Sequence, residues 1–363
     1  MTIMPVNSTF VPPPANIASG PLPRSRSLDF ALFVAAALWY MCAQALSSSA
    51  ASVLGMNFDL GDWRPLLEAV LLLVLLFCGL ALLRRIERRL APLRITLGLP
   101  RRATSRAEWA TGAAIGWGLG VASVLPMAVA RALDTQLWMA PRAFLLFGLS
   151  LLTLAFLSLA HTLAIYGYGY QRLIDATGPV RATLVLVVVV TLVHSLVPTP
   201  YGTPDGTRTL VDILMTLLLC LCWLRTHAVW LAWGLHFAWA AAIAVLFGLP
   251  IAGQVGFGSV VDTRAVGPAW LTGGEYGPAA ALFTIFIFLA AIPILIRATS
   301  DFAWNYTHPP LIPGGYDVTI APPAAHVAME QAAESAQAVH TASLVQIQTS
   351  FTEQRPATET VSE

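Results

Sequence analysis

The chain has 363 residues and a net charge of +1, and 57% of its residues are hydrophobic while only 11% are charged, against about 25% in an ordinary soluble domain. This composition excludes a soluble multidomain enzyme, a disordered chain and a disulfide scaffold, and it disfavours a nucleic-acid binder, which needs a surplus of cations. So much apolar surface needs lipid around it, and the sequence therefore predicts a polytopic membrane protein whose first partner is the lipid bilayer.

The elements follow from the positions of the apolar segments. Residues 1–28 are rich in proline and serine, and we expect them to be disordered rather than to form a secretory signal. Eight apolar segments of spanning length follow, so the expected fold is an all-α transmembrane bundle of about eight helices. In order, these segments are Phe30–Ser48, Pro65–Leu83, Ala110–Val129, Ala143–Tyr166, Ala182–Val197, Leu210–Leu224, Val229–Leu249 and Ala279–Ile296.

The segments group into regions. Residues 29–142 contain three helices and a basic loop, and residues 143–297 contain the other five. The tail, 298–363, is polar and broken by prolines, so we expect it to be mostly disordered with one exposed helix over Ala324–Val339.

All 20 basic residues are arginines, and they alternate between loops. Eight of them lie between Arg84 and Arg106, after the second helix, and further arginines precede the first helix or follow the fourth, sixth and eighth. By the positive-inside rule, both termini are expected in the cytoplasm of a multi-pass protein of the cell membrane.

Three histidines lie inside predicted helices: His161, His194 and His236. Their separations from the arginines place them at similar depth on three helices, so we expect them to share one polar cavity open to the cytoplasmic side. They are either members of one site or separate interhelical hydrogen-bonding residues. No cofactor is expected, although three neutral imidazoles would also suit Zn²⁺ with an open fourth position.

Carboxylates are absent at the same depth. Glu68 and Asp212 are predicted at helix ends, within reach of water, and no carboxylate pair is predicted inside the bundle. An aspartyl-type intramembrane protease, a rhomboid-like protease and a His-Glu-x-x-His zinc protease are therefore not supported.

Two further segments carry structural expectations. Tyr166–Arg172 ends the fourth helix, and we interpret its tyrosines as an aromatic belt at the membrane surface and its glycines as sites of close backbone approach. Gly267–Pro278 is dense in turn residues and is expected to be an ordered outer loop in which Glu275 is solvated.

Between Ala143 and Ile296 the sequence resembles the CPBP (Abi) family of type II CAAX prenyl endopeptidases and bacteriocin-processing membrane proteins. Gly167–Leu173 matches the tail of the family's first motif, Glu-Glu-x-x-x-Arg continued by Gly-Tyr and Gln-Arg-Leu. Val190–His194 matches Phe-x-x-x-His with Val for Phe, and Val229–His236 matches a Leu-Trp-x-x-x-Gly-Leu-His run. The resemblance implies a CPBP-type core in residues 143–297.

The same alignment shows degenerate motifs. The family's two glutamates fall on His161 and Thr162, its arginine on Tyr166, and its final Asn or Asp on Ala240, so only His194 and His236 persist. In the family, a glutamate and a histidine are thought to activate water while a His/Asn pair stabilises the oxyanion. The resemblance thus implies candidate site residues His194 and His236, with His161 in place of a glutamate.

Three functions remain open. The first is a catalytically degenerate family member that binds a membrane protein or a prenylated-peptide-like ligand. The second is an intramembrane endopeptidase with altered histidine-based or metal chemistry. The third is a transporter or lipid-handling protein, which no sequence feature favours.

Overall fold

The computed structural model describes residues 25–87, 92–254, 257–300, 302, 326–329 and 331–335. The disorder expected for 1–28 and 298–363 falls mostly outside these ranges, although α1 already begins at Arg26 and residues 326–329 and 331–335, within the helix expected over Ala324–Val339, are helical. The main helices are α1 (Arg26–Asn57), α2 (Arg64–Glu87), α3 (Leu93–Thr96), α4 (Ser105–Val129), α5 (Pro141–His161), α6 (Tyr170–Thr177), α7 (Pro179–Ser195), α8 (Asp205–Thr226), α9 (Trp230–Ala241), α10 (Ala269–Thr272) and α11 (Leu282–Ala298). Two π-helical segments, Thr162–Gly169 and Ala242–Leu246, continue α5 and α9. The two strands are β1 (Leu133–Leu137) and β2 (Val261–Ala265). Short 3-10 turns cover Gly61–Trp63, Gly274–Tyr276 and Pro278–Ala280.

The predicted all-α bundle is confirmed, because each of the eight apolar segments is a helix. Five helices are long and apolar enough to cross a membrane, including the continuous 37-residue helix Pro141–Thr177. The other three apolar helices, Pro179–Ser195, Trp230–Leu246 and Leu282–Ala298, are shorter. The protein is therefore an integral membrane protein.

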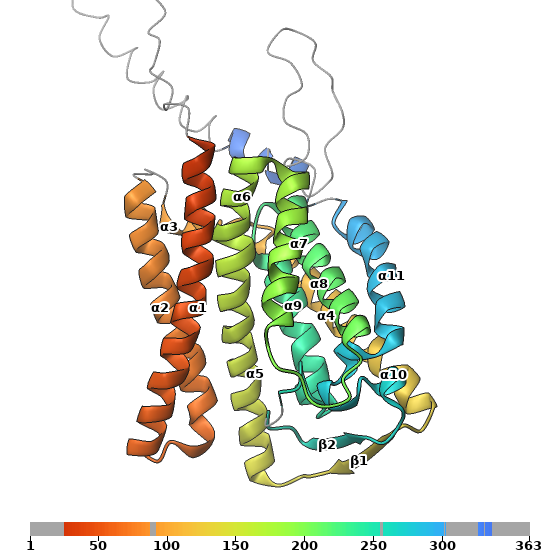
Figure 1. Ribbon diagram of the computed structural model, residues 1–363. Coiled ribbons are helices and arrows are strands. Elements are labelled where there is room, and N and C mark those ends of the chain that lie inside the picture. The colour runs from red at the N-terminus through yellow and green to blue at the C-terminus, as the bar shows by residue number, and fades with distance from the viewer. Residues whose placement is uncertain are drawn as a thin grey trace, which may run out of the picture.

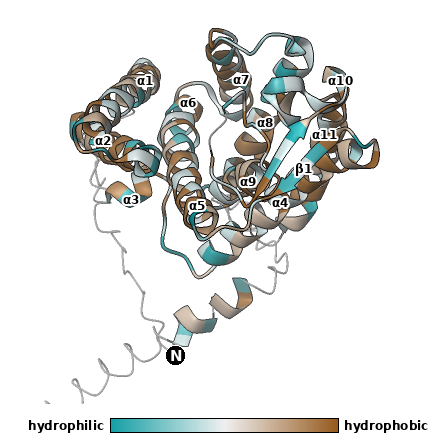
Figure 2. Cartoon of the chain, turned by 90° about the horizontal axis from the view of Figure 1, so that it is seen from below, coloured by the Kyte–Doolittle hydropathy of each residue, from teal (hydrophilic) through white to brown (hydrophobic). Residues whose placement is uncertain are grey.

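The long helix of α5 and α6 runs through the middle of the bundle (Figure 1). α1 and α2 form a pair against one side of it, and α4, α7, α8, α9 and α11 lie on the other side (Figures 1 and 2). We call the end that carries Arg84, Arg85 and Arg172 the basic end, and the end that carries β1 and β2 the ribbon end. Large hydrophobic side chains such as Leu38 of α1, Leu82 of α2, Val188 of α7 and Phe286 of α11 are exposed, as contact with lipid requires.

Glycines set the closest helix contact, which joins α4 to α9. A Cβ on Gly112 or Gly116 of α4 would overlap the carbonyl oxygen of Leu231 or Leu235 of α9. Gly234 of α9 meets the carbonyl oxygen of Trp109 in the same way. Small residues let two backbones approach in lipid, where packing rather than water exclusion drives association.

The ribbon was not predicted. β1 and β2 pair antiparallel, with Leu133 opposite Ala265 and Leu137 opposite Val261. Each strand has five residues, and its partner lies more than a hundred residues away in the chain. Such a pair depends on where the helices place the loops, which local sequence patterns do not encode.

The aromatic belt predicted for Tyr166–Arg172 is wrong. Tyr166, Tyr168 and Tyr170 are at most 1% exposed, because the π-helical segment and the start of α6 lie inside the bundle. The expected close approach at Gly167 is confirmed, since a Cβ there would crowd the carbonyl oxygen of Leu97.

Arg172 forms a buried ion cluster at the basic end. Its side chain is 0% exposed and lies 2.8 Å from Glu87 of α2, 2.7 Å from Asp175 and 3.9 Å from Asp29 of α1. The Tyr168 hydroxyl donates to the same Glu87 carboxylate at 2.8 Å. This cluster joins α1, α2 and α6. Arg172 therefore stabilises the contact between these helices, in addition to adding positive charge at the basic end.

Candidate functional site

A cavity of about 720 Å³ lies between α1, the α5 helix with its π-helical extension, and α7. Apolar side chains such as Phe33, Met41 and Val190 supply most of its wall. Its lining runs from Phe33 and Gly169, on the side of the basic end, to Thr199, Gln254 and neighbouring loop residues at the ribbon end. The opening to the cytoplasmic side stays a prediction. Its polar lining residues are Tyr40, Gln44, Ser48, Glu68, His161, His194, Thr199, Arg208, Gln254 and Tyr276. We call it the histidine cavity.

His161 lies at the end of α5, where the regular helix gives way to the π-helical segment. Its Nδ1 lies 3.4 Å from the Tyr40 hydroxyl, and its ring centroid lies 5.8 Å from that of Tyr166 and 5.0 Å from that of His236. π-helical turns are frequent at functional sites because they reorient side chains. The structure therefore places His161 among rings from three helices.

His236, in the second turn of α9, lies behind His161, which separates it from the cavity. It is absent from the residues that line the cavity, and its Nδ1 has no hydrogen-bond partner in the described ranges. His161 and His194 both line the cavity, and the His236 ring lies against the His161 ring. The three predicted histidines thus come together, with two on the cavity wall and the third directly behind one of them.

His194 lies in the last turn of α7 and has a carboxylate partner that the sequence did not indicate. Its Nδ1 is 3.4 Å from Asp212 of α8, whose side chain is 17% exposed. A carboxylate at this position holds an imidazole in one orientation and stabilises its protonated form. Asp212 was predicted at a helix end within reach of water, but α8 already begins at Asp205. Its pairing with His194 depends on how α7 and α8 meet in space.

Arg208 is the second residue that the sequence did not single out as a site residue. It lies in the first turn of α8, is 7% exposed and lines the histidine cavity. Its guanidinium donates a hydrogen bond to the backbone carbonyl of His194 and lies over the Tyr276 ring, with 5.3 Å from Cζ to the centroid. Burial raises the pKa of Tyr276, so its hydroxyl stays protonated at neutral pH.

The metal hypothesis has a geometric requirement. Within the described ranges, no group of three or more His, Cys, Asp or Glu side chains lies close enough together to ligate one metal ion. A zinc site made of His161, His194 and His236 would require one nitrogen of each ring to converge near 2.0–2.1 Å from the ion. For His194 this nitrogen would be Nε2, because Nδ1 lies beside Asp212.

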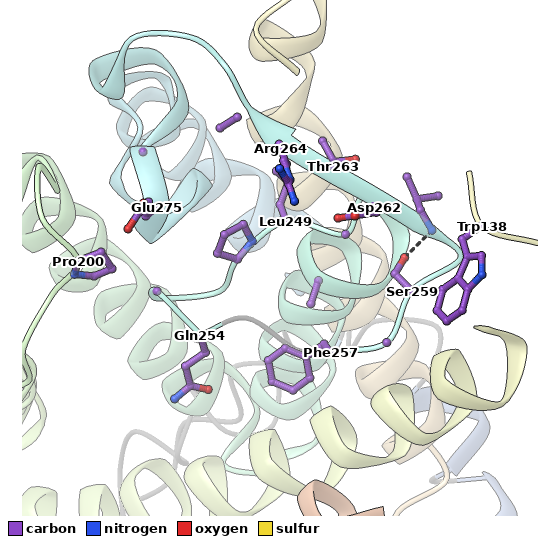
Figure 3. Close-up of a pocket in the computed structure, with 18 residues that line it drawn as sticks. Trp138, Pro200, Leu249, Gln254, Phe257, Ser259, Asp262, Thr263, Arg264 and Glu275 are labelled. Carbon is purple, nitrogen blue, oxygen red and sulfur yellow. Dashed lines mark hydrogen bonds between the residues drawn. The ribbon is translucent and has the colours of Figure 1, made fainter. Parts of the chain in front are cut away.

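A second cavity, of about 900 Å³, lies at the ribbon end beneath β2 (Figure 3). Asp262, Arg264 and Glu275 line it, and the Ser259 hydroxyl accepts a hydrogen bond from the Val261 amide at 3.0 Å. His161, His194 and His236 are not among the described residues that line it, so it does not combine with the predicted site residues. Gln254 lines both cavities and marks where they adjoin.

The ordered loop expected at Gly267–Pro278 is confirmed. It contains α10 and the 3-10 turn Gly274–Tyr276, and Glu275 is exposed as predicted. The buried ring of Tyr276 extends from this loop to Arg208, so the loop also completes the wall of the histidine cavity.

Comparisons with known proteins assign no family to this arrangement. No family model, no curated protein and no solved structure matches the chain. The site must therefore be interpreted from its own geometry.

Proposed function

We propose that this protein is a ligand-binding integral membrane protein with a CPBP-type core, in which the peptidase activity of that family is lost. The proposal combines the motif resemblance with the juxtaposition of the three histidines that occupy or replace motif positions. The observation that carries it is the surroundings of His161. In the described ranges this ring meets Tyr40, Tyr166 and His236, and no carboxylate hydrogen-bonds to it.

Peptide hydrolysis needs a base within hydrogen-bond reach of a water and donors directed at the developing oxyanion. Thr162 and Ala240, at the positions of a glutamate and of Asn or Asp, cannot provide a base or a second donor. Thr162 already donates to the backbone carbonyl of Ser158 at 2.8 Å, which holds its hydroxyl against its own helix. Losing several members of such a unit removes most of the rate, but it leaves the cavity able to bind a ligand.

A second candidate function, a hydrolase with altered chemistry, is favoured by one observation. The 3.4 Å approach of His194 to Asp212 forms a carboxylate–imidazole pair, and His194 lines the cavity. Such a pair can act as a general base if the other imidazole nitrogen reaches a water beside a substrate carbonyl.

One assay separates the two functions. The purified protein is incubated with a prenylated CAAX peptide, with and without chelator, beside His194→Ala and Asp212→Asn. We expect no cleavage above background in any of these samples. Turnover that both substitutions abolish would establish the hydrolase instead, and turnover that chelator also abolishes would favour the three-histidine metal site.

The proposal includes the cell membrane as location and the cytoplasm as the compartment of both termini. It is supported by the arginines of the basic end and by the positive-inside rule. A reporter fused after Glu363 should be active only in a cytoplasmic format. Activity in an extracytoplasmic format would reverse the assignment of every helix.

A further inference from the structure

Arg208 places a cation at one end of a mostly apolar cavity inside the membrane protein. Two contacts fix its guanidinium there: the hydrogen bond to the His194 carbonyl and the stacking on Tyr276. Both partners belong to other elements, so the position of the guanidinium is set by the meeting of α7, α8 and the 274–276 turn. A buried charge in this setting is costly unless it has a partner.

The carboxylates around Arg208 do not saturate it. Asp205 lies 3.7 Å from Nη1 and Asp212 lies 3.8 Å from Nε, both longer than the roughly 2.7–2.9 Å of a charge-assisted hydrogen bond. The Asp205 side chain is 73% exposed, so water screens its charge. Nε has no hydrogen-bond partner in the part of the chain that the structure describes. A guanidinium has five N–H donors, and donors therefore remain for an anion at the cavity wall.

The remainder of the cavity suits a hydrocarbon chain. Val189 and Val193 of α7 line it opposite Phe33 and Met41 of α1. On the adjacent face of α7, Val188 is 56% exposed and belongs to the surface that would contact lipid. The cavity thus lies one helix face away from the bilayer.

From these observations we infer that the histidine cavity binds an amphiphile with a carboxylate or phosphate headgroup, the headgroup on Arg208 and the hydrocarbon chain between α1 and α7. The inference names the ligand of the proposed binding function and therefore depends on it. Glu68 also lines the cavity and would repel an anion, so the headgroup belongs at the Arg208 end. The His194–Asp212 pair adjoins the headgroup position.

The test uses the full-length protein in nanodiscs and the fluorescent fatty acid cis-parinaric acid, with its uncharged methyl ester as the matched probe. We expect the acid to bind at least about tenfold more tightly than the ester. Arg208→Gln should remove this preference, and Arg208→Lys should restore part of it, because lysine keeps the charge but not the bidentate donors. The control is Arg142→Gln, at an exposed arginine paired with Asp62, which should leave the preference unchanged.

A second pair of variants tests where the hydrocarbon chain of the ligand lies. Val189→Trp fills the cavity wall and should weaken acid and ester alike, whereas Val188→Trp, on the lipid-facing side, should weaken neither. Competition by oleate, by dioleoylphosphatidate and by inorganic phosphate then distinguishes a fatty acid, an anionic phospholipid and a free anion.

The outcomes separate two failures. Equal affinity for acid and ester in the wild type, with sensitivity to Val189→Trp, would overturn the anion inference and leave the binding function standing. Insensitivity of both probes to Val189→Trp would show that the cavity is not their site and would overturn both. Because the wild-type ratio is decisive by itself, a folding defect of Arg208→Gln does not prevent the test.

Discussion

Arg172 and Arg208 are both almost completely buried, but they lie at opposite ends of the bundle in different surroundings. Arg172 lies within 2.8 Å of two carboxylates, and its cluster joins three helices. Among the residues that the structure describes, the carboxylate nearest to Arg208 is 3.7 Å away, and Arg208 lines a cavity of about 720 Å³. The difference indicates that burial of a charge does not by itself mark a functional site. What marks one is a buried charge whose hydrogen-bonding capacity is left open beside a cavity.

The largest effect on stability is expected at the basic end, in the Arg172 cluster. Arg172→Met removes the cation between Glu87 and Asp29 and leaves buried negative charge, which costs about 3–5 kcal/mol. The thermal unfolding of the purified variant, followed in detergent, should shift strongly downward, whereas Arg142→Met at an exposed arginine should not. An unfolding temperature equal to the wild type would contradict the structural role of the cluster.

The packed interface between α4 and α9 permits a similar test without charge. Gly116→Ala introduces a methyl group that overlaps the Leu235 carbonyl, and we expect a loss of about 1–3 kcal/mol. Gly118 of the same helix has open space around its Cα, so Gly118→Ala is the matched control. Equal unfolding temperatures for the two variants would show that the helices can separate at no cost.

Toward the ribbon end, the His194–Asp212 pair should contribute little to stability. The His194 side chain is 40% exposed, and partly exposed pairs contribute less than about 1 kcal/mol. The unfolding temperature of Asp212→Asn should therefore be close to that of the wild type. A loss as large as that of Arg172→Met would mean that this end is also structural, and the contrast between the two arginines would fail.

The parts of the structure that the sequence predicted depend on local pattern. The eight helices follow from apolar segments, and the approach of His161 to His236 follows from their equal distance from arginines along the chain. Asp212 and Arg208 were not predicted as site residues, because their roles depend on how the end of α7 meets the start of α8. The tyrosines of Tyr166–Arg172 were misplaced since aromatic residues beside glycines have the same pattern at a membrane surface and in a buried π-helix.

The smallest predicted effect concerns Glu68, the carboxylate on the wall of the same cavity. No ion pair joins Glu68 to Arg208 in the described ranges, so its influence on a bound anion acts through the cavity rather than by contact. A unit charge that acts without direct contact, and is screened by salt, changes the free energy of anion binding by about 0.5 kcal/mol or less. Glu68→Gln should therefore tighten cis-parinaric acid binding roughly twofold. Glu275→Gln, at an exposed carboxylate on the other cavity, should not change it. The methyl ester should respond to neither substitution, because it has no charge to repel. Weaker binding of the acid to Glu68→Gln would contradict repulsion by Glu68 and would indicate that this side chain contacts the bound acid.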